Sequence, residues 1–564
     1  MIECLQVVDA KLTSEGGNID TVMMASNGAV YIMNNVYVPS DFNCVATPAF
    51  IRSTNSIMYW AIYSDDFLPA GVTRYMGLNY FAYLKAMQSR FTFFLPNDEA
   101  MSYYYDPMSF TCRNPRVMRF IYTSGNFPFA TSSYRGRRTS ANYDIETGTI
   151  KGDMLSQSLT TAEIVNRLRM MLEHQTIVHQ NGINAINTEE DEYYLSKNGM
   201  GIKVTRGTNE AGQPRVIRAQ GGFQLENERE GLTQGDNPGI LYCNVVENGE
   251  YKNGWTFTLD APLIPAARSV FSVLSQIKRG QKGLPSEFVK EGNEYYKFFT
   301  LCEGADEELI KKSGVVDESL YDISKPEDKK KLERAIDKYR TFVDNNAVDQ
   351  NVQFFNNYRY TVFVPNNDAI EKAIQNGLPT WESIQEDFDE CDKDDDGNLT
   401  NAADSLRLQH KIIYLTNFIR THFADNTVFA DKSELTGTGG LPVEMTTSSY
   451  DQEKGLFVKA FVQRVKTGGE TVLQVRDNFS DDTQWREASN DEKYKNIMTC
   501  DRENSKTVKD ASSLNGTTTS ASSYAVVHLI DGVLNHEQLD ADGQYPSFTN
   551  AKESRAYIKR FAIR

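Results

Sequence analysis

The residues best suited to binding a metal ion form one acidic loop. Asp392, Asp394 and Asp396 occupy positions one, three and five of a run that has glycine at position six and an apolar residue at position eight. This is the spacing of the first half of an EF-hand calcium loop, in which converging oxygens bind a hard cation. It predicts a calcium site formed by the three carboxylates and the carbonyl of Asn398. A solvated acidic loop is the alternative, because position twelve, where a bidentate acid belongs, is Ala403.

The histidines do not suggest a catalytic centre. His174 and His179 are five residues apart, which does not place both on one helix face. His528 stands in a run of Val, Leu and Ile and is interpreted as a packed, hydrogen-bonded side chain rather than a ligand or general base. The adjacent acids Asp98 and Glu99 could serve a glycosidase, but their place after a strand suits helix capping. The sequence predicts no catalytic residue and, apart from calcium, no cofactor.

A strand that runs into a helix is predicted at two places where the sequence repeats itself. Residues 91–101 read FTFFLPNDEAM, and residues 360–370 read YTVFVPNNDAI. The β-branched and aromatic run suits a buried strand, the proline ends it, and the asparagine can cap the helix that follows. The positions that the two copies share are Thr92, Pro96, Asn97, Thr361, Pro365 and Asn366.

A second motif occurs three times. Residues 27–39 read NGAVYIMNNVYVP, residues 253–265 read NGWTFTLDAPLIP, and residues 524–536 read YAVVHLIDGVLNH. In the first two copies Asn-Gly supplies a turn with positive φ, and a hairpin strand follows it. The interval from Pro96 to Pro365 is almost the same as the interval from Phe257 to His528, so the two motifs share one period.

The motif pair resembles the two signature boxes of fasciclin domains. In the last domain the front box is residues 361–369 and the back box, VVHLIDGVL, is residues 526–534, which makes His528 and Asp531 the matching residues. Between the boxes the family carries a Tyr-His or similar pair after a helix. The sequence offers Glu173-His174 and Thr421-His422 for it, so His422 is also matched.

The middle domain departs from this pattern. Phe257 stands where the family usually has histidine, and Asp260-Ala261-Pro262 replaces Ile-Asp-Gly. The fold that the resemblance implies is nevertheless the same for both: α+β, in tandem fasciclin-like domains, each a twisted β-sandwich or wedge with helices packed on it.

The resemblance and the period together divide the chain. Residues 1–40 are expected to be the closing strands of a truncated fasciclin-like domain, 41–270 and 271–540 two fasciclin-like domains, and 541–564 a C-terminal tail. Both domains exceed the length of a minimal module, so insertions are expected. Three segments have loop composition and are the candidates: 103–150, 205–250 and 476–522.

Composition excludes several classes of function. A formal net charge of −17 argues against wrapping nucleic acid or lying on an anionic membrane. The seven cysteines contain no CxxC pair, which argues against a zinc or thioredoxin-like centre. No run of about 18 apolar residues is present, and no signal peptide is visible at the start. The protein is therefore either cytoplasmic or part of a longer precursor.

The resemblance favours the second alternative. It implies a non-enzymatic, exported binding or adhesion protein on the cell surface or outer membrane of a Bacteroides-type bacterium, with any membrane attachment through a lipid anchor on the longer precursor. Such proteins are often accessory lipoproteins of outer-membrane nutrient (glycan) uptake systems. The expected partner is an extracellular glycan, a surface protein or an outer-membrane transporter complex. The alternative is a glycan-active enzyme that uses residues in the insertions.

Overall fold

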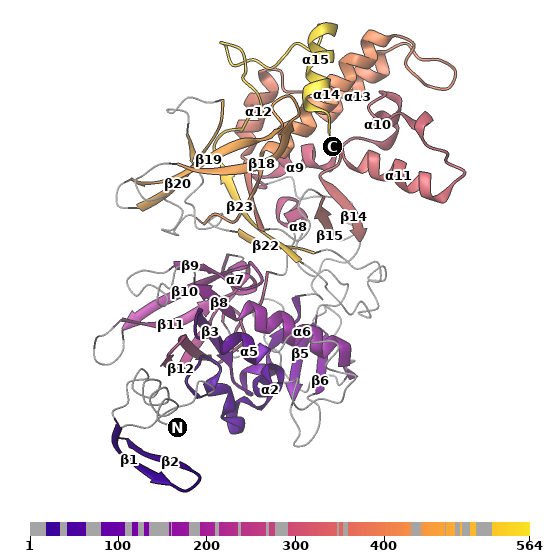
Figure 1. The fold of residues 1–564 in the computed structure, drawn as a ribbon. Helices are drawn as coiled ribbons and strands as arrows, with labels where there is room; N and C mark the ends of the chain where they lie inside the picture. The colour runs from indigo at the N-terminus through magenta and orange to yellow at the C-terminus, as the bar shows by residue number, and fades with distance from the viewer. Residues whose placement is uncertain are drawn as a thin grey trace.

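The computed structural model describes residues 19–33, 42–63, 80–107, 116–121, 129–134, 157–158, 161–179, 192–208, 212, 214–229, 231–234, 238–266, 270–276, 292–346, 349–353, 359–429, 442–467, 470–479, 485–487, 497–502 and 522–563. Figure 1 shows two α+β domains, one above the other, and a separate hairpin near the N-terminus. None of the described helices is long and apolar enough to span a bilayer.

The first domain is built on a seven-stranded sheet that almost closes on itself. Its order is β8 (Thr176–His179), β3 (Arg90–Pro96), β13 (Gly254–Leu259), β12 (Cys243–Tyr251), β11 (Pro214–Gln220), β10 (Gly201–Thr208) and β9 (Glu192–Leu195). Only β3 and β13 are parallel neighbours in this sheet as described; the other pairs are antiparallel. A single bridge between Ile177 and Ser196 links the two ends of the sheet.

Helices and a small second sheet cover this domain. The helices are η2 (Thr47–Phe50), α2 (Arg52–Ile62), α5 (Tyr80–Leu84), η3 (Ala100–Ser102), α6 (Thr161–His174) and α7 (Gly222–Arg229). The small sheet contains β4 (Tyr104–Tyr105), β5 (Arg116–Ile121), β6 (Phe129–Tyr134) and β7 (Gln157–Ser158). Strand β3 is buried on both faces: Phe91 and Phe93 pack toward the helices, and Phe94 packs inside the curved sheet.

The second domain has an eight-stranded sheet. Its order is β21 (Arg486–Glu487), β20 (Glu470–Asp477), β19 (Leu456–Thr467), β18 (Val443–Asp451), β17 (Phe423–Asp425), β16 (Arg359–Pro365), β23 (Ser522–Ile530) and β22 (Ile497–Arg502). Strands β16 and β23 are parallel. As in β3, alternate residues of β16 face the helices (Tyr360, Val362) and the inside of the sheet (Phe363).

The helices of the second domain form its larger core. They are α8 (Val270–Leu274), α9 (Tyr296–Glu303), α10 (Glu307–Lys312), η6 (Glu318–Leu320), α11 (Pro326–Asp337), α12 (Asn367–Gln375), α13 (Trp381–Glu390), α14 (Ala402–Thr421) and α15 (Ala551–Phe561), with a two-stranded sheet of β14 (Phe342–Asn346) and β15 (Asp349–Val352). Helix α14 is buried over most of its length, from Leu408 onward.

The two domains repeat one topology. The strand neighbours β8-β3-β13-β12 correspond to β17-β16-β23-β22. The single bridge between Ile177 and Ser196 corresponds to the single pair Ala424 and Thr447 that joins β17 to β18. The predicted fold class is therefore confirmed: the chain contains tandem α+β domains, each with helices packed on a twisted, nearly closed sheet.

The predicted insertions are only partly loops. Residues 205–250 were expected to form one, but they contain β11, α7 and most of β12, which are integral parts of the first domain. The segment 103–150 contributes β5 and β6 to the small sheet, and 476–522 contains β21 and β22. The remaining parts of the last two segments lie largely outside the described residues.

The expected C-terminal tail also has a defined place. Residues 541–564 contain α15, and its Tyr557 and Phe561 belong to the core of the second domain. The helix is capped at its start by Asn550, whose side chain accepts hydrogen bonds from two backbone amides. The second unit thus continues past residue 540; the other domain boundaries stay predictions.

A small apolar cluster joins the two domains. Tyr193 and Phe429 stack with their ring centroids 4.9 Å apart and their planes nearly parallel. Met200 and Ala266 from the first domain and Val526 from the second complete the buried cluster. Both domains therefore contribute to one packed junction.

Candidate functional site

The first box forms the same corner in both domains. The side-chain oxygen of Asn97 accepts a hydrogen bond from the backbone N–H of Ala100 at 2.8 Å, and Asn366 accepts one from Ala369 at 2.8 Å. The backbone N–H groups of Asn97 and Asn366 donate to the last residues of β13 and β23, respectively. Each asparagine thus caps the turn after its strand and fastens it to the closing box, while Pro96 and Pro365 end the strands.

The residue after each asparagine joins a second helix to the corner. The Asp98 carboxylate accepts hydrogen bonds from the backbone N–H groups of Ser56 and Ile57, both at 2.9 Å, where α2 is kinked. In the second domain Asn367 accepts from the backbone N–H of Lys297 at 2.9 Å, at the start of α9. Asp98 therefore serves as a helix cap rather than as a free carboxylate.

The two threonines of the first box are buried. Each forms hydrogen bonds with residues at or just after the end of the neighbouring antiparallel strand, β8 in the first domain and β17 in the second. The Thr92 hydroxyl lies 2.7 Å from Nε2 of His179. The Thr361 hydroxyl donates to the carbonyl of Asn426 at 2.8 Å and accepts from the N–H of Val428 at 3.1 Å.

His422 lies at the C-terminal end of α14 and is completely buried. Its Nδ1 is 2.9 Å from the carbonyl of Phe418, and its Nε2 accepts a hydrogen bond from the backbone N–H of Leu534 at 3.0 Å. The contacts fix a neutral ring with its proton on Nδ1, and burial lowers the pKa of His422 to about 3. This side chain fastens the segment after the closing box to the long helix.

The counterpart of His422 in the first domain is Gln175, not His174. The N–H of Phe94 donates to the carbonyl of Gln175, and the N–H of Phe363 donates to the carbonyl of His422, both at 2.9 Å. The sequence-based pairing of Glu173-His174 with Thr421-His422 was therefore wrong by one residue. His174 is buried beside the hydroxyl of Ser196 at 3.4 Å, and burial lowers its pKa to about 3.

The residue-by-residue match between the two closing boxes also differs by one position from the sequence comparison. Asp260 accepts from the backbone N–H of Asn244 at 2.7 Å, and Asp531 accepts from the backbone N–H of Glu487 at 2.8 Å. In the ladders, Leu259 pairs with Pro96 and Ile530 with Pro365. Asp260 is thus the equivalent of Asp531, so the middle domain keeps the aspartate that the sequence comparison had placed out of register.

His528 and Phe257 are true equivalents. Phe257 pairs with Phe94 and stacks on it at 5.7 Å, whereas His528 pairs with Phe363 and stacks on it at 5.9 Å. The Nε2 of His528 is also 2.8 Å from the carbonyl of Val428, and burial lowers the pKa of His528 to about 4. It is the packed, hydrogen-bonded histidine that its apolar surroundings in the sequence indicated.

The acidic loop lies between α13 and α14, in a helix-loop-helix. Asp394 accepts hydrogen bonds from the backbone N–H groups of Asp396 at 3.1 Å and Asn398 at 2.7 Å. These bonds, the one from Asn398 first, hold the pKa of Asp394 below its usual value. The Lys312 ammonium donates to the carbonyl of Asp396 and the side-chain oxygen of Asn398, both at 3.0 Å.

In this arrangement Asp392, Asp394 and Asp396 do not converge. Across the described ranges, no group of three or more His, Cys, Asp or Glu side chains is placed to hold a metal ion. Asp394 closes its own loop, and a lysine supplies positive charge to oxygens of Asp396 and Asn398. The calcium site stays a prediction.

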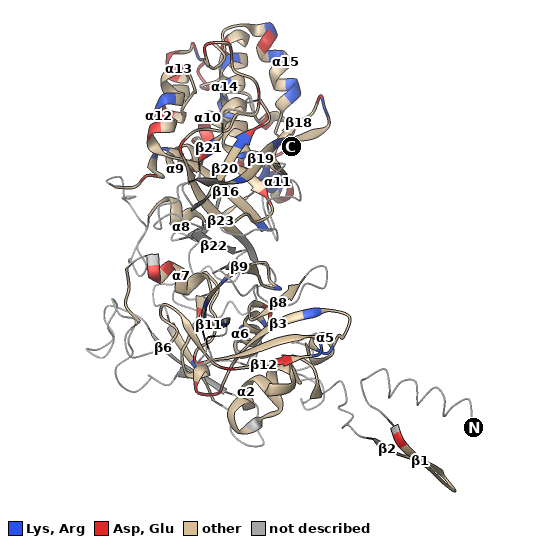
Figure 2. Ribbon diagram, turned by 90° about the vertical axis from the view of Figure 1, so that its left-hand side faces the viewer, with Lys and Arg blue, Asp and Glu red and all other residues tan. Residues whose placement is uncertain are grey.

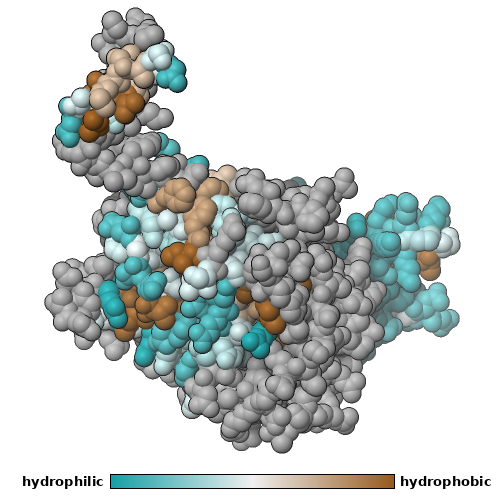
Figure 3. All heavy atoms as spheres, turned by 90° about the horizontal axis from the view of Figure 1, so that it is seen from below, coloured by the Kyte–Doolittle hydropathy of each residue, from teal (hydrophilic) through white to brown (hydrophobic). Residues whose placement is uncertain are grey.

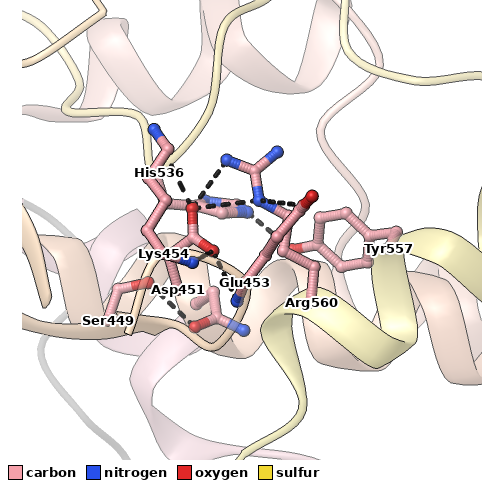
Figure 4. Close-up of polar contacts among 8 residues, drawn as sticks. Ser449, Asp451, Glu453, Lys454, His536, Tyr557 and Arg560 are labelled. Atoms are coloured by element: carbon pink, nitrogen blue, oxygen red, sulfur yellow. Dashed lines mark hydrogen bonds and ion pairs between the residues drawn. The ribbon is translucent and has the colours of Figure 1, made fainter. Parts of the chain in front are cut away.

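A polar cluster that sequence reasoning missed holds α15 against β18 (Figure 4). Arg560 donates to one oxygen of Asp451 from Nε at 3.0 Å and from Nη2 at 2.7 Å. The other oxygen of Asp451 accepts from the N–H groups of Glu453 and Lys454. Burial raises the pKa of Asp451, but the hydrogen bonds from Arg560 and the backbone outweigh it, so the net shift is downward.

Buried aromatic and histidine groups continue this cluster into the core. His536 Nε2 lies 2.6 Å from the hydroxyl of Tyr557, and burial lowers the pKa of His536 to about 3. Burial raises the pKa of the neighbouring Glu537 to about 7, against the opposing charge of Arg560. The signal in the sequence was Tyr557 and Phe561, two aromatic residues four apart in an otherwise charged helix.

No protein-family model matches the chain, and no curated protein matches its sequence. One solved structure, a FAS1 domain pair from the insect cell adhesion molecule fasciclin I, is similar over 86% of this chain and 98% of that chain, with 9% identity and a TM-score of 0.21. The strand order and the parallel pairs β3–β13 and β16–β23 define the fold that the two domains share.

Proposed function

We propose that the protein is a non-enzymatic binding or adhesion protein of the cell surface. The observation that carries this proposal is that equivalent motif side chains have the same structural role in both domains. Asn97 matches Asn366, Asp260 matches Asp531, and in both domains these residues hydrogen-bond to the backbone of the scaffold. A scaffold repeated in this way supports binding by the outer surfaces, where the two domains differ.

The proposed setting is the outer membrane of a Bacteroides-type bacterium, with the protein facing outward as an accessory lipoprotein of a glycan-uptake system. The lipid anchor would lie on a longer precursor. Figure 2 shows acidic and basic residues mixed along α12 and α15. With a net charge of −17, such a surface suits a neutral glycan, a surface protein or an outer-membrane transporter complex better than a polyanion.

A binding experiment tests this role. The folded chain is immobilised and exposed to a panel of polysaccharides and purified outer-membrane proteins. We expect binding to at least one member. As a matched control, the Asp531→Asn variant should bind with unchanged affinity in its folded fraction, because Asp531 bonds to the scaffold. Failure to bind any member, or loss of binding in the folded variant, would count against the proposal.

A further inference from the structure

The hairpin of β1 (Ile19–Ala25) and β2 (Gly28–Met33) pairs with no other described strand. It exposes five large apolar side chains, with exposed fractions from 40 to 57%: Val22, Met23, Met24, Val30 and Ile32. Figure 3 shows this hydrophobic surface on the arm that leaves the rest of the molecule. So much apolar surface on so short an element marks a contact face.

The pairing of this hairpin repeats that of β12 and β13. Ala25 pairs with Gly28 at its turn, as Tyr251 pairs with Gly254. At the far end of β2 the register shifts, so that Met33 pairs with Ile19; in the first domain the same shift pairs Leu259 with Val245. Turn, register and irregularity therefore coincide position for position. Irregularities of this kind bend a strand at a defined point and are built features of a sheet.

The glycine at the turn shows how closely a neighbouring strand packs against the outer edge of the closing strand. In the first domain β13 lies parallel to β3, and a Cβ on Gly254 would lie 1.8 Å from the backbone oxygen of Phe91. Gly254 also has a φ of 142°, which side chains rarely allow. Gly28 takes the same place in β2, yet no described heavy atom lies within 4 Å of its Cβ position. Gly28 does not have a positive φ, so the turn does not require glycine there, and neither does any described neighbour.

We propose that β1 and β2 are the closing hairpin of a third domain of the same fold. The free edge of β2 then pairs in parallel with a strand equivalent to β3 and β16, and the exposed apolar side chains enter the core of that domain. The position of Gly28 is where the backbone of the partner strand passes closest.

The connectivity of the two complete domains indicates the source of this strand. Gly254 pairs with Phe91, and Tyr524 pairs with Arg359. In both domains the partner strand precedes the closing strand by a long and nearly equal stretch of chain. The same connectivity makes the proposed occupant a strand that precedes β1 in the same polypeptide.

Hydrogen exchange on the chain of this sequence and on the full-length gene product tests the proposal. We expect the amides of β2 to exchange at least tenfold more slowly in the full-length protein. The Gly28→Val variant should abolish this protection there, because its side chain meets the partner strand, and should leave exchange unchanged in the shorter chain. Gly254→Val is the matched control, which should disrupt the first domain in both proteins.

Three results would overturn the proposal. One is equal exchange of β2 in the two proteins, and another is full protection in the Gly28→Val variant of the full-length protein. The third is concentration-dependent dimerisation of the shorter chain, seen by sedimentation, with protection of β2, which would make a second copy of the chain the occupant.

Discussion

At the residue scale, most of the conspicuous polar side chains of this protein hold its own backbone together. His422 is the clearest case, because both ring nitrogens have backbone partners on separate segments, at Phe418 and Leu534. Removing one partner of a buried hydrogen bond leaves the other unsatisfied, which costs more than the bond contributes when formed. Substitutions at these positions should therefore act on stability.

Removing the acceptor at His422 tests this role. His422→Leu should lower the free energy of unfolding of the second domain by roughly 1–3 kcal/mol, because the N–H of Leu534 loses its acceptor. Gln175→Leu is the matched control in the first domain and should cost less, because the buried side-chain amide of Gln175 has no hydrogen-bond partner among the described residues. Urea denaturation measures both. An unchanged midpoint for His422→Leu would contradict the assigned role.

At the acidic loop, a substitution of Asp394 can act through the loop's own hydrogen bonds or through calcium binding, and the two effects must be measured separately. Asp394→Ala should lower the melting temperature in chelator, because Asp394 closes the loop through the amides of Asp396 and Asn398. Only the predicted calcium site requires the melting temperature of the unmodified chain to rise with added calcium. Thermal unfolding with calcium and with chelator distinguishes the two. If calcium leaves the unmodified chain unchanged, the loop is a solvated, self-capped turn.

The sequence identified the right side chains but not always their partners. The two boxes share a rigid strand-and-corner geometry, so Thr92, Asn97 and their counterparts could be matched by type and spacing alone. Between the boxes the chain leaves a helix, and a one-residue difference there changes no hydrophobic pattern. This is why His174 was paired with His422, although the backbone places Gln175 there.

At the element scale, the packing of α15 shows what local composition conceals. The helix is rich in Lys, Arg and Glu and was interpreted as a tail, yet Tyr557 and Phe561 pack in the core. Strand β12 was misread for a related reason: much of it is exposed, so its Asn, Gly and Glu resemble a loop. In both cases tertiary contacts, which are not visible in a local window, decide the structure.

The ion pair between Arg560 and Asp451 should fasten α15 to the domain. Arg560→Met should lower the free energy of unfolding by roughly 1–3 kcal/mol, because the buried Asp451 loses its two charged hydrogen bonds. Arg555→Met, an exposed arginine on the same helix, is the matched control and should change little. Equal stability of the two variants in chemical denaturation would refute this role of Arg560.

At the scale of the whole molecule, the two copies of the fold differ in what they bury. Among the described residues, the second domain holds the buried histidines His410, His422, His528 and His536, and the first holds His174. Burial lowers the pKa values of all five to about 3 or 4. An unfolded histidine titrates near 6.5, so between about pH 6.5 and 4 the unfolded chain binds more protons than the folded one.

Acid should therefore weaken the second domain more steeply than the first. Stability that is present above pH 6.5 is lost as the pH falls, by at most about 1.4 kcal/mol per buried histidine per pH unit. Glu537 opposes this trend, because its raised pKa of about 7 favours the folded state at lower pH. Hydrogen exchange at pH 7.5 and 5.5 resolves the two domains. Equal losses of protection in both would contradict this prediction.

The most direct test of the proposed role is the fate of the bound partner. The folded chain is incubated with the polysaccharide or protein that it binds, and the mass distribution of that partner is followed by light scattering and mass spectrometry. A binding protein returns its partner at unchanged mass, as a heat-denatured control does. Shortened or modified products that appear only with the folded chain would show an enzyme and contradict the proposal.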